Sequence, residues 1–165
     1  MLHNGPVRPQ IGGIGAAMSF QGGCLCGAAR YTIKRSFLNA MHCYCGMCRK
    51  AHGALFSTHI VVKPQQLQWH PDADSRQSFE SSPGAYREFC PHCGTHLLVH
   101  GQTGDDTLAV PAGTLDQDVS LTILGHMFVH DKPAWYEIRD ALPQHDGWPP
   151  GFHDQTSGAS SGPAI

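Results

Sequence analysis

Cysteines are the residues whose type and spacing point most directly to chemistry in this sequence. All seven belong to a C-x-C or C-x-x-C group: Cys24, Cys26, Cys43, Cys45, Cys48, Cys90 and Cys93. An odd number cannot all pair in disulfides, and cysteines this close make poor disulfide partners unless the pair is redox-active. Clustered thiols of this kind are typical of metal sites in a reducing compartment, which we expect to be the cytoplasm.

The first and last cysteine pairs together offer four thiolates. We name them the four-cysteine cluster: Cys24, Cys26, Cys90 and Cys93. A glycine follows each pair, and a glycine with positive φ lets backbone N–H groups point at the thiolates. The pattern predicts a closed structural zinc site that joins two distant segments of the chain. The alternative, a redox-active "CPHCG", is less favoured because no βαβ pattern surrounds it.

The stretch "MHCYCGMCRK" (41–50) supplies the remaining thiols. We name them the three-cysteine cluster: Cys43, Cys45 and Cys48. Three protein ligands and one open position are typical of a catalytic zinc, because the open position takes water or substrate.

Two alternatives to an open zinc site stay open. In the first, a histidine beside a cysteine group closes a structural Cys3His site, and the candidates are His42, His52 and His92. In the second, the C-x-x-C pairs at 45–48 and 90–93 combine as a zinc ribbon. That arrangement leaves Cys43 and the pair at 24–26 without a role.

Short strands are expected to position these cysteines. Runs of β-branched and aromatic residues predict them at 28–34, 57–63, 85–90, 95–100, 107–113 and 125–130. Only residues 46–53 read as a helical turn, and no longer segment has a clear helical period. Nineteen glycines and twelve prolines are scattered along the chain, which favours short elements joined by turns. We therefore predict a mainly β fold without internal repeats.

Composition limits the classes of partner. Only 15% of the 165 residues are charged, the formal net charge is −2, and no run of Lys or Arg exceeds two residues. This argues against nucleic acid and anionic membranes as partners. No stretch approaches 18 consecutive apolar residues, so no transmembrane helix is expected.

One folded domain is expected between two less ordered ends. Residues 1–18 predict a flexible extension without the pattern of a signal peptide, and Met18 is a candidate start of the folded part. Residues 149–165 are rich in Pro, Gly and Ser and predict a disordered tail. The domain is expected to span residues 19–148.

The order and spacing of three motifs carry a family resemblance. "GGCLCGAARY", "HCYCGMCRKAHGALF" and "REFCPHCGTHL", with the later "VHDKPAWYEIRDALPQ" (129–144), resemble the glutathione-dependent formaldehyde-activating enzyme family, also called the GFA or CENP-V domain family. The resemblance covers roughly residues 19–148. It implies an Mss4-like β-tent, a fold of small antiparallel sheets organised around zinc.

The resemblance also implies roles for the cysteines and an activity. The four-cysteine cluster would hold a structural zinc and the three-cysteine cluster a second, catalytic-type zinc. The implied reaction is that of a carbon–sulfur lyase, the reversible condensation of formaldehyde with glutathione to S-(hydroxymethyl)glutathione. The competing hypothesis is a non-catalytic scaffold with two structural zincs, and a zinc chaperone or thiol sensor rests only on the number of thiols. The oligomeric state is left open.

Other residues near the cysteines are weaker candidates. Glutathione carries two carboxylates, so the neighbouring basic residues are possible contacts: Arg49, Lys50 and Arg87. Lys50 is expected to be a solvated surface charge. Ser81 and Ser82 either line the approach or form an ordinary turn. Trp135 is expected to pack in the core or at its rim. Three strand histidines are expected to be packing residues without an acid–base role: His59, His96 and His130.

Overall fold

The computed structural model describes residues 18–34, 38–101 and 107–150, and its strands form two sheets. The three-stranded sheet has the order β1-β2-β5, with β1 at Ser19–Gly23, β2 at Ala29–Lys34 and β5 at Leu67–Asp74. Residues 1–17 and 151–165 lie outside the described residues, so the flexible extension and the disordered tail stay predictions.

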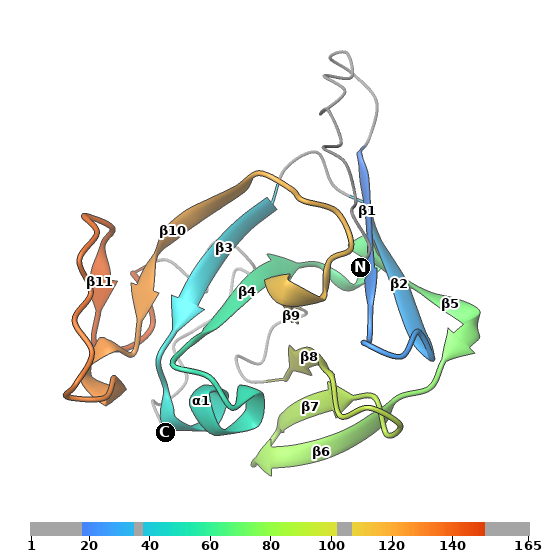
Figure 1. The fold of residues 1–165 in the computed structure, drawn as a ribbon, viewed down its shortest axis with the longest axis horizontal. Coiled ribbons are helices and arrows are strands. Elements are labelled where there is room, and N and C mark those ends of the chain that lie inside the picture. Colours follow the sequence, from blue (N-terminus) through green and yellow to red (C-terminus); the bar gives the residue numbers. More distant parts are fainter. Residues whose placement is uncertain (1–17, 35–37, 102–106, 151–165) are drawn as a thin grey trace, which may run out of the picture.

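The second sheet has eight strands in the order β11-β10-β3-β4-β9-β8-β7-β6. Their bounds are Leu38–Cys43 for β3, Ser57–Val62 for β4, Gln77–Ser82 for β6, Ala85–Phe89 for β7, His96–His100 for β8, Leu108–Pro111 for β9, Leu121–Met127 for β10 and Gln144–His145 for β11. Figure 1 shows this sheet curving from β11 and β10 over β3 and β4 to β7 and β6, while β1, β2 and β5 stand at the other side of the molecule.

Helical structure is limited to short elements. The single α-helix of the described residues, α1, spans Gly46–His52, and the 3-10 helices η1, η2 and η3 span Pro64–Gln66, Ala112–Thr114 and Val129–Asp131. The thiol of Cys45 caps α1 by accepting a hydrogen bond from the backbone N–H of Cys48 at 3.3 Å. Gly53 ends the helix in the left-handed conformation with φ at 57°.

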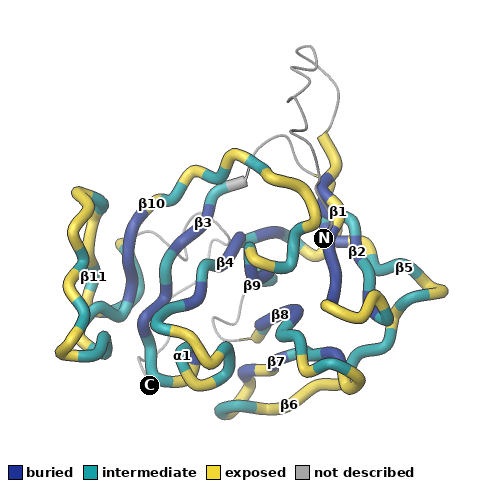
Figure 2. Tube along the Cα trace, in the orientation of Figure 1, coloured by how far each residue is buried: buried dark blue, intermediate teal, exposed yellow. Residues whose placement is uncertain are grey.

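Alternating apolar side chains explain why the strands bury one face. In β2, Ala29, Tyr31 and Ile33 are fully buried, while the residues between them are partly exposed. The same core takes Ile60 and Val62 from β4, and Figure 2 shows the buried stretches of these strands meeting in the middle of the molecule. The two sheets therefore share one hydrophobic core.

The predicted mainly β fold is confirmed, and the described strands add some that the sequence patterns missed. All six predicted strands and the predicted helical turn are present. The strand predicted at 125–130 corresponds to β10, which ends at Met127 instead of residue 130. Phe128 has a positive φ of 58° and begins η3 there. The missed strands are β1, β3, β5, β6 and β11.

β10 departs from the predicted antiparallel pattern. It pairs in parallel with β3 on one side and with β11 on the other. Parallel neighbours need a long crossover connection, and six strands of both sheets lie between β3 and β10 in the sequence. This pairing brings the last part of the described chain beside the three-cysteine cluster.

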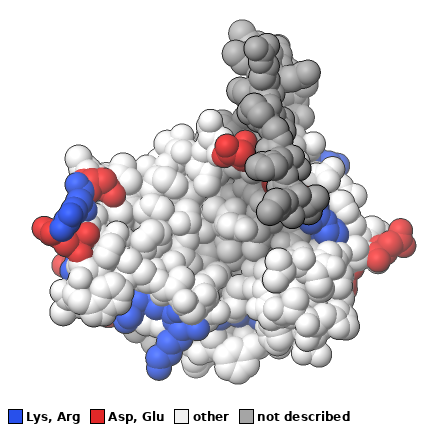
Figure 3. All heavy atoms as spheres, in the orientation of Figure 1, with Lys and Arg blue, Asp and Glu red and all other residues white. Residues whose placement is uncertain are grey.

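The surface carries few charges. On the face shown in Figure 3, the charged side chains lie in separate small groups, and other residues form most of the visible surface. In the described part of the chain, no helix is long and apolar enough to cross a membrane.

Candidate functional site

The four-cysteine cluster lies where the two sheets meet. Its first pair follows β1, and its second pair stands in the turn between β7 and β8. The four sulfur atoms all lie within 4.8 Å of one another. The Sγ atom of Cys26 lies 3.5 Å from that of Cys24 and 3.7 Å from that of Cys90. Four thiolates at about 2.3 Å from a tetrahedral ion would be separated by about 3.8 Å, so this donor set fits a zinc ion.

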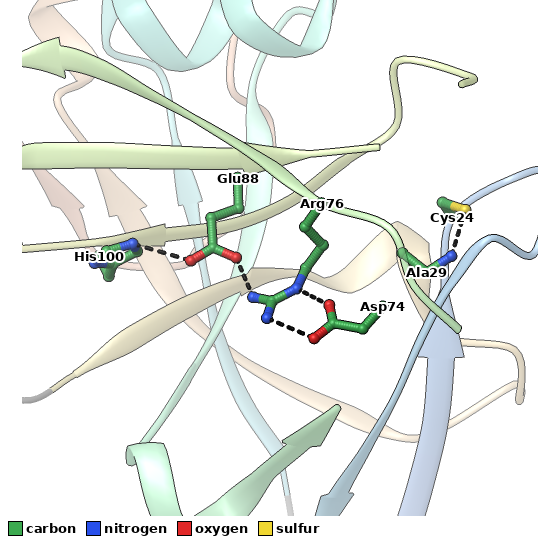
Figure 4. A network of polar contacts seen from close by, with 6 residues as sticks. All are labelled: Cys24, Ala29, Asp74, Arg76, Glu88 and His100. Carbon is green, nitrogen blue, oxygen red and sulfur yellow. Dashed lines mark hydrogen bonds and ion pairs between the residues drawn. The ribbon is translucent and has the colours of Figure 1, made fainter. Parts of the chain in front are cut away.

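Backbone and side-chain groups support these sulfurs. The N–H of Ala29 donates to the Cys24 sulfur at 3.2 Å (Figure 4). Gly27 and Gly94 have positive φ values of 82° and 72°, as the sequence predicts for the glycines after each pair. Hydrogen bonding to Thr95 lowers the pKa of Cys93 to about 5, which favours the thiolate. The local structure thus prepares the cluster for a cation.

The three-cysteine cluster is formed by the end of β3 and the start of α1. The sulfurs of Cys43, Cys45 and Cys48 lie within 4.8 Å of one another. In the sheet, Cys43 is paired with Met127 of β10 and with Ser57 of β4. The structure therefore groups the seven thiols as four and three, and it does not bring the pairs at 45–48 and 90–93 together as a zinc ribbon.

A cavity of about 610 Å³ opens beside the three-cysteine cluster. All three cysteines line it, together with apolar side chains that include Met47, Val99, Met127 and Phe128. The volume lies in the range of small-molecule sites. The four-cysteine cluster borders a separate hollow instead, with Arg30 and Asp116 beside it. That hollow, at about 540 Å³, is more open and less apolar, so the three-cysteine cluster faces the more enclosed of these two cavities within the described residues.

Arg87 supports the three-cysteine cluster from β7. Its side chain is only 2% exposed, and its two terminal nitrogens lie 3.9 Å and 3.8 Å from the Cys48 sulfur. Its Nε atom donates to Ser81 Oγ at 3.2 Å. A buried guanidinium requires an anion, and among the described residues the Cys48 thiolate is the anion that it contacts.

The pKa values of the thiols in the three-cysteine cluster are shifted in different directions. Hydrogen bonds from the Cys43 and Cys45 thiols, assisted by the charge of Arg87, lower the pKa of Cys48 to about 3. The same hydrogen bonds and burial raise the pKa of Cys43. Cys48 therefore carries the negative charge of the cluster, next to Arg87.

Three histidines lie near Arg87: His59 is buried, and His52 and His96 are partly buried. The His52 ring is 5.5 Å from that of His59 and 4.7 Å from that of His96. Burial and, to a smaller extent, the positive charge of Arg87 lower the pKa of each to about 4. Within the described residues, His52 Nε2 and His96 Nδ1 are buried without a hydrogen-bond partner. We name these three residues the imidazole cluster; it is neutral at neutral pH.

No histidine among the described residues completes the three-cysteine cluster. His42 precedes Cys43 on β3, so its side chain points to the opposite face of the sheet, where Nδ1 lies 2.9 Å from Thr58 Oγ1. His52 belongs to the imidazole cluster, and His92 is exposed in the turn between β7 and β8. The structure does not support the Cys3His alternative.

The basic candidates do not line the cavity. Arg49 donates from Nε to the backbone carbonyl of Tyr44 at 3.0 Å, and Lys50 is exposed. Arg87 lies behind Cys48. Ser82 does line the cavity, whereas Ser81 binds Arg87.

The remaining candidates are divided between the cavity and the rest of the molecule. His59 and His130 line the cavity, and His96 belongs to the imidazole cluster. The expectation that Trp135 packs in the core or at its rim is wrong, because the residue is 79% exposed.

Sequence reasoning missed an aromatic wall of the cavity. Phe128 and Trp148 both line it, with ring centroids 5.2 Å apart and the ring planes at 81°. Trp148 is the last residue of the expected domain, directly before the segment predicted to be a disordered tail. Phe128 is the residue other than glycine with a positive φ in the described chain. Backbone strain of this kind is concentrated at functional sites.

His100, another cavity residue, is held by a polar network. Its Nε2 atom lies 3.1 Å from Glu88, and Arg76 pairs with both Glu88 and Asp74 (Figure 4). The guanidinium of Arg76 also lies 3.8 Å above the centre of the Trp69 ring. The network fixes His100 on the cavity wall and links β5, β7 and β8 through Arg76, which lies between β5 and β6.

Comparison of the sequence with known proteins identifies the family of this chain. Residues 19–131 match the sequence pattern of the family described as "Glutathione-dependent formaldehyde-activating enzyme". The chain belongs to this family. Family relatives from Aspergillus flavus and Aspergillus oryzae are each 32% identical over 124 residues, which are 72% of this chain and 59% of the relative. The chain thus spans less than two thirds of the length of these relatives.

A solved structure supports the fold expected for this family. The crystal structure of a Rhodobacter sphaeroides protein matches with a TM-score of 0.51 at 19% sequence identity, covering 62% of this chain and 98% of that chain. At this identity the likeness shows the fold alone. The predicted fold of small sheets and the predicted family are therefore both confirmed.

Proposed function

We propose that this chain is a zinc-dependent enzyme of the carbon–sulfur lyase type that acts on adducts of a thiol and an aldehyde. The adduct that the family's description indicates is S-(hydroxymethyl)glutathione, with glutathione as the thiol. The observation that carries the proposal is the three-cysteine cluster on the wall of a cavity of about 610 Å³. Three protein ligands beside a ligand-sized space are the arrangement of a catalytic metal site.

Two zinc ions per chain follow from the two clusters. The four-cysteine cluster would hold one and join the two sheets, while Cys43, Cys45 and Cys48 would hold the other. A zinc ion at the second site would lower the pKa of an incoming thiol and favour its thiolate.

The residues around the second site have separate tasks. Arg87 compensates the charge of three thiolates, which would otherwise leave the site with a net charge of −1. Met127 and Phe128 keep the space beside Cys43 apolar, which strengthens electrostatic interactions there. His59 lies on the cavity wall as a neutral imidazole, with Ser57 Oγ 3.1 Å from its Nδ1 atom.

The reaction balances without a further reactant. In the direction of condensation, a bond forms between the thiol sulfur and the aldehyde carbon, and the thiol proton goes to the aldehyde oxygen. The reverse reaction breaks the same carbon–sulfur bond and returns the proton to sulfur. This chemistry suits a folded domain of residues 19–148 with a small-molecule substrate, acting in the reducing cytoplasm.

The alternative is a scaffold in which both zinc ions are structural. The cavity favours the enzyme, because an enclosed and mainly apolar space beside three metal ligands is typical of a small-molecule site. The test is an NMR exchange measurement of formaldehyde with glutathione, compared with the spontaneous rate. Exchange should exceed the spontaneous rate in the wild type, return to it in Cys48→Ser and stay high in Arg139→Gln, a control at an exposed side chain. Wild-type exchange no faster than the spontaneous rate, with glutathione and with every other thiol offered, would favour the scaffold.

A further inference from the structure

One wall of the cavity combines aromatic rings with carboxylates. Phe128 and Trp148 meet nearly at a right angle, and Asp131 and Asp146 line the same cavity. We name these four residues the aromatic–acidic wall. Two rings at a corner with carboxylates beside them are the surroundings that an ammonium group prefers, because ring faces and carboxylates both attract a cation.

The aromatic–acidic wall is built as one unit. It comes from two segments, residues 128–131 and 146–148, and His130 joins them through a contact of 2.6 Å between its Nδ1 atom and the backbone oxygen of Asp146. The other nitrogen of His130 lies 3.0 Å from the Asp131 carboxylate. Phe128 and Trp148 also pack against the buried group that contains Cys43 and Cys48. A ligand held at the wall is therefore held beside the three-cysteine cluster.

The charges around the cavity favour a cationic ligand over an anionic one. Asp131 and Asp146 contribute negative charge to the lining, whereas a zinc ion and Arg87 would balance the charge of the three thiolates. His100 and His130, the exposed or partly exposed imidazoles of the lining, already face carboxylates. Arg49 and Arg87, the guanidiniums nearest in sequence to the cysteines, bind a backbone carbonyl and the Cys48 sulfur. None of the basic candidates for the carboxylates of glutathione, Arg49, Lys50 and Arg87, lines the cavity.

We propose that the aromatic–acidic wall binds an ammonium group of the ligand, so that the preferred thiol is apolar and cationic and not a dicarboxylate such as glutathione. That the ligand is a thiol rests on the proposed function. That it carries an ammonium group rests on the aromatic–acidic wall alone. In this proposal, Phe128 and Trp148 present their rings to the cation, and the carboxylate of Asp146 balances its charge.

Binding of choline tests the ammonium site without any reaction. Choline and its neutral carbon isostere, 3,3-dimethylbutan-1-ol, are titrated into the zinc-loaded full chain and followed by calorimetry. Choline should bind more tightly than the isostere. Trp148→Ala should weaken choline binding about five- to thirtyfold, and Asp146→Asn about two- to fivefold.

Two control variants separate loss of the ammonium site from a change of fold. Trp148→Phe keeps a ring in place and should retain most of the choline affinity. Trp135→Ala removes a tryptophan that is 79% exposed and outside the cavity lining, and it should leave choline binding unchanged. Equal binding of choline and its isostere, or an equal loss in Trp135→Ala and Trp148→Ala, would overturn the ammonium site.

A comparison of thiols tests the substrate class. Exchange with formaldehyde is measured for thiocholine, 3-mercaptopropionate and glutathione, each against its own spontaneous rate. Thiocholine should show the largest acceleration, and Asp146→Asn should reduce its advantage. A larger acceleration with glutathione or 3-mercaptopropionate would refute the inference and leave the proposed function standing. Choline binding without acceleration of any thiol would refute the proposed function and leave the ammonium site standing.

Discussion

Arg87 is the residue that would balance the charge of the proposed metal site. Its guanidinium is buried, and Cys48 provides the anion that it contacts in the described structure. Three thiolates around a divalent ion carry a net charge of −1, and one guanidinium brings the total to zero. A neutral site is less costly to bury than a charged one, which explains a cation at this position.

Replacement of Arg87 tests this role. Arg87→Met leaves Cys48 without its cation, and we expect the free energy of unfolding of the protein as isolated to fall by about 3 kcal/mol. Arg87→Lys keeps the charge and should recover part of the loss. Arg139→Met, at an exposed side chain, is the control and should change stability by less than about 0.5 kcal/mol. Urea unfolding with the same stability for Arg87→Met and wild type would contradict the account.

The imidazole cluster predicts a pH dependence of stability. Burial lowers the pKa of His96 from its usual 6.5 to about 4, so the unfolded chain takes up a proton before the folded protein does. Its contribution to stability is complete above about pH 6.5 and is lost as the pH falls toward 4. His96→Leu should therefore lose less stability than the wild type in this interval, by about 1.4 kcal/mol per pH unit.

The pH measurement has its own control. His145→Gln alters a histidine outside the imidazole cluster and should keep the wild-type slope of unfolding free energy against pH. The same slope in His96→Leu and His145→Gln would show that the buried imidazole is not responsible.

At the scale of elements, α1 positions two of the three thiols and ends at a glycine. Gly46 and Gly53 stand at its two ends, and an added Cβ would meet no atom within 4 Å at either. They differ in backbone, since only Gly53 has a positive φ, at 57°. Gly53→Ala should lower the unfolding free energy by about 1–2 kcal/mol. Gly46→Ala should raise it by about 0.5 kcal/mol, because alanine favours the helix. A loss of similar size in both variants, measured by urea unfolding, would contradict this explanation of the cap.

Local chemistry decided which elements the sequence could predict. β2 and β4 carry β-branched and aromatic residues and were predicted, whereas β6 has the polar sequence QSFESS at an edge of the sheet and was missed. β3 was missed because its sequence, LNAMHC, contains no β-branched residue. Its pairing with β4 and β10 supplies the preference that the strand itself lacks.

At the scale of the whole molecule, the cysteine groups could be predicted from the sequence, whereas the cavity beside them could not. Cysteine spacing is local, so the C-x-C and C-x-x-C groups could be identified from the sequence, but it is the fold that joins the pairs at 24–26 and 90–93 and removes the zinc-ribbon alternative. The cavity depends on the parallel pairing of β3 with β10, which places Met127 beside Cys43 and brings Phe128 and Trp148 to the same side. No local pattern encodes that pairing, and the aromatic–acidic wall therefore appears only in the folded structure.

The metal content of three proteins tests the central claim, that one cluster stabilises the fold and the other serves a ligand. Zinc per chain and folding are measured for the wild type, Cys45→Ser and Cys93→Ser. The account predicts about two zinc ions in the wild type. Cys45→Ser should remain folded with one zinc ion, and Cys93→Ser should lose its fold. If Cys45→Ser unfolds as Cys93→Ser does, both sites are structural and the account is contradicted.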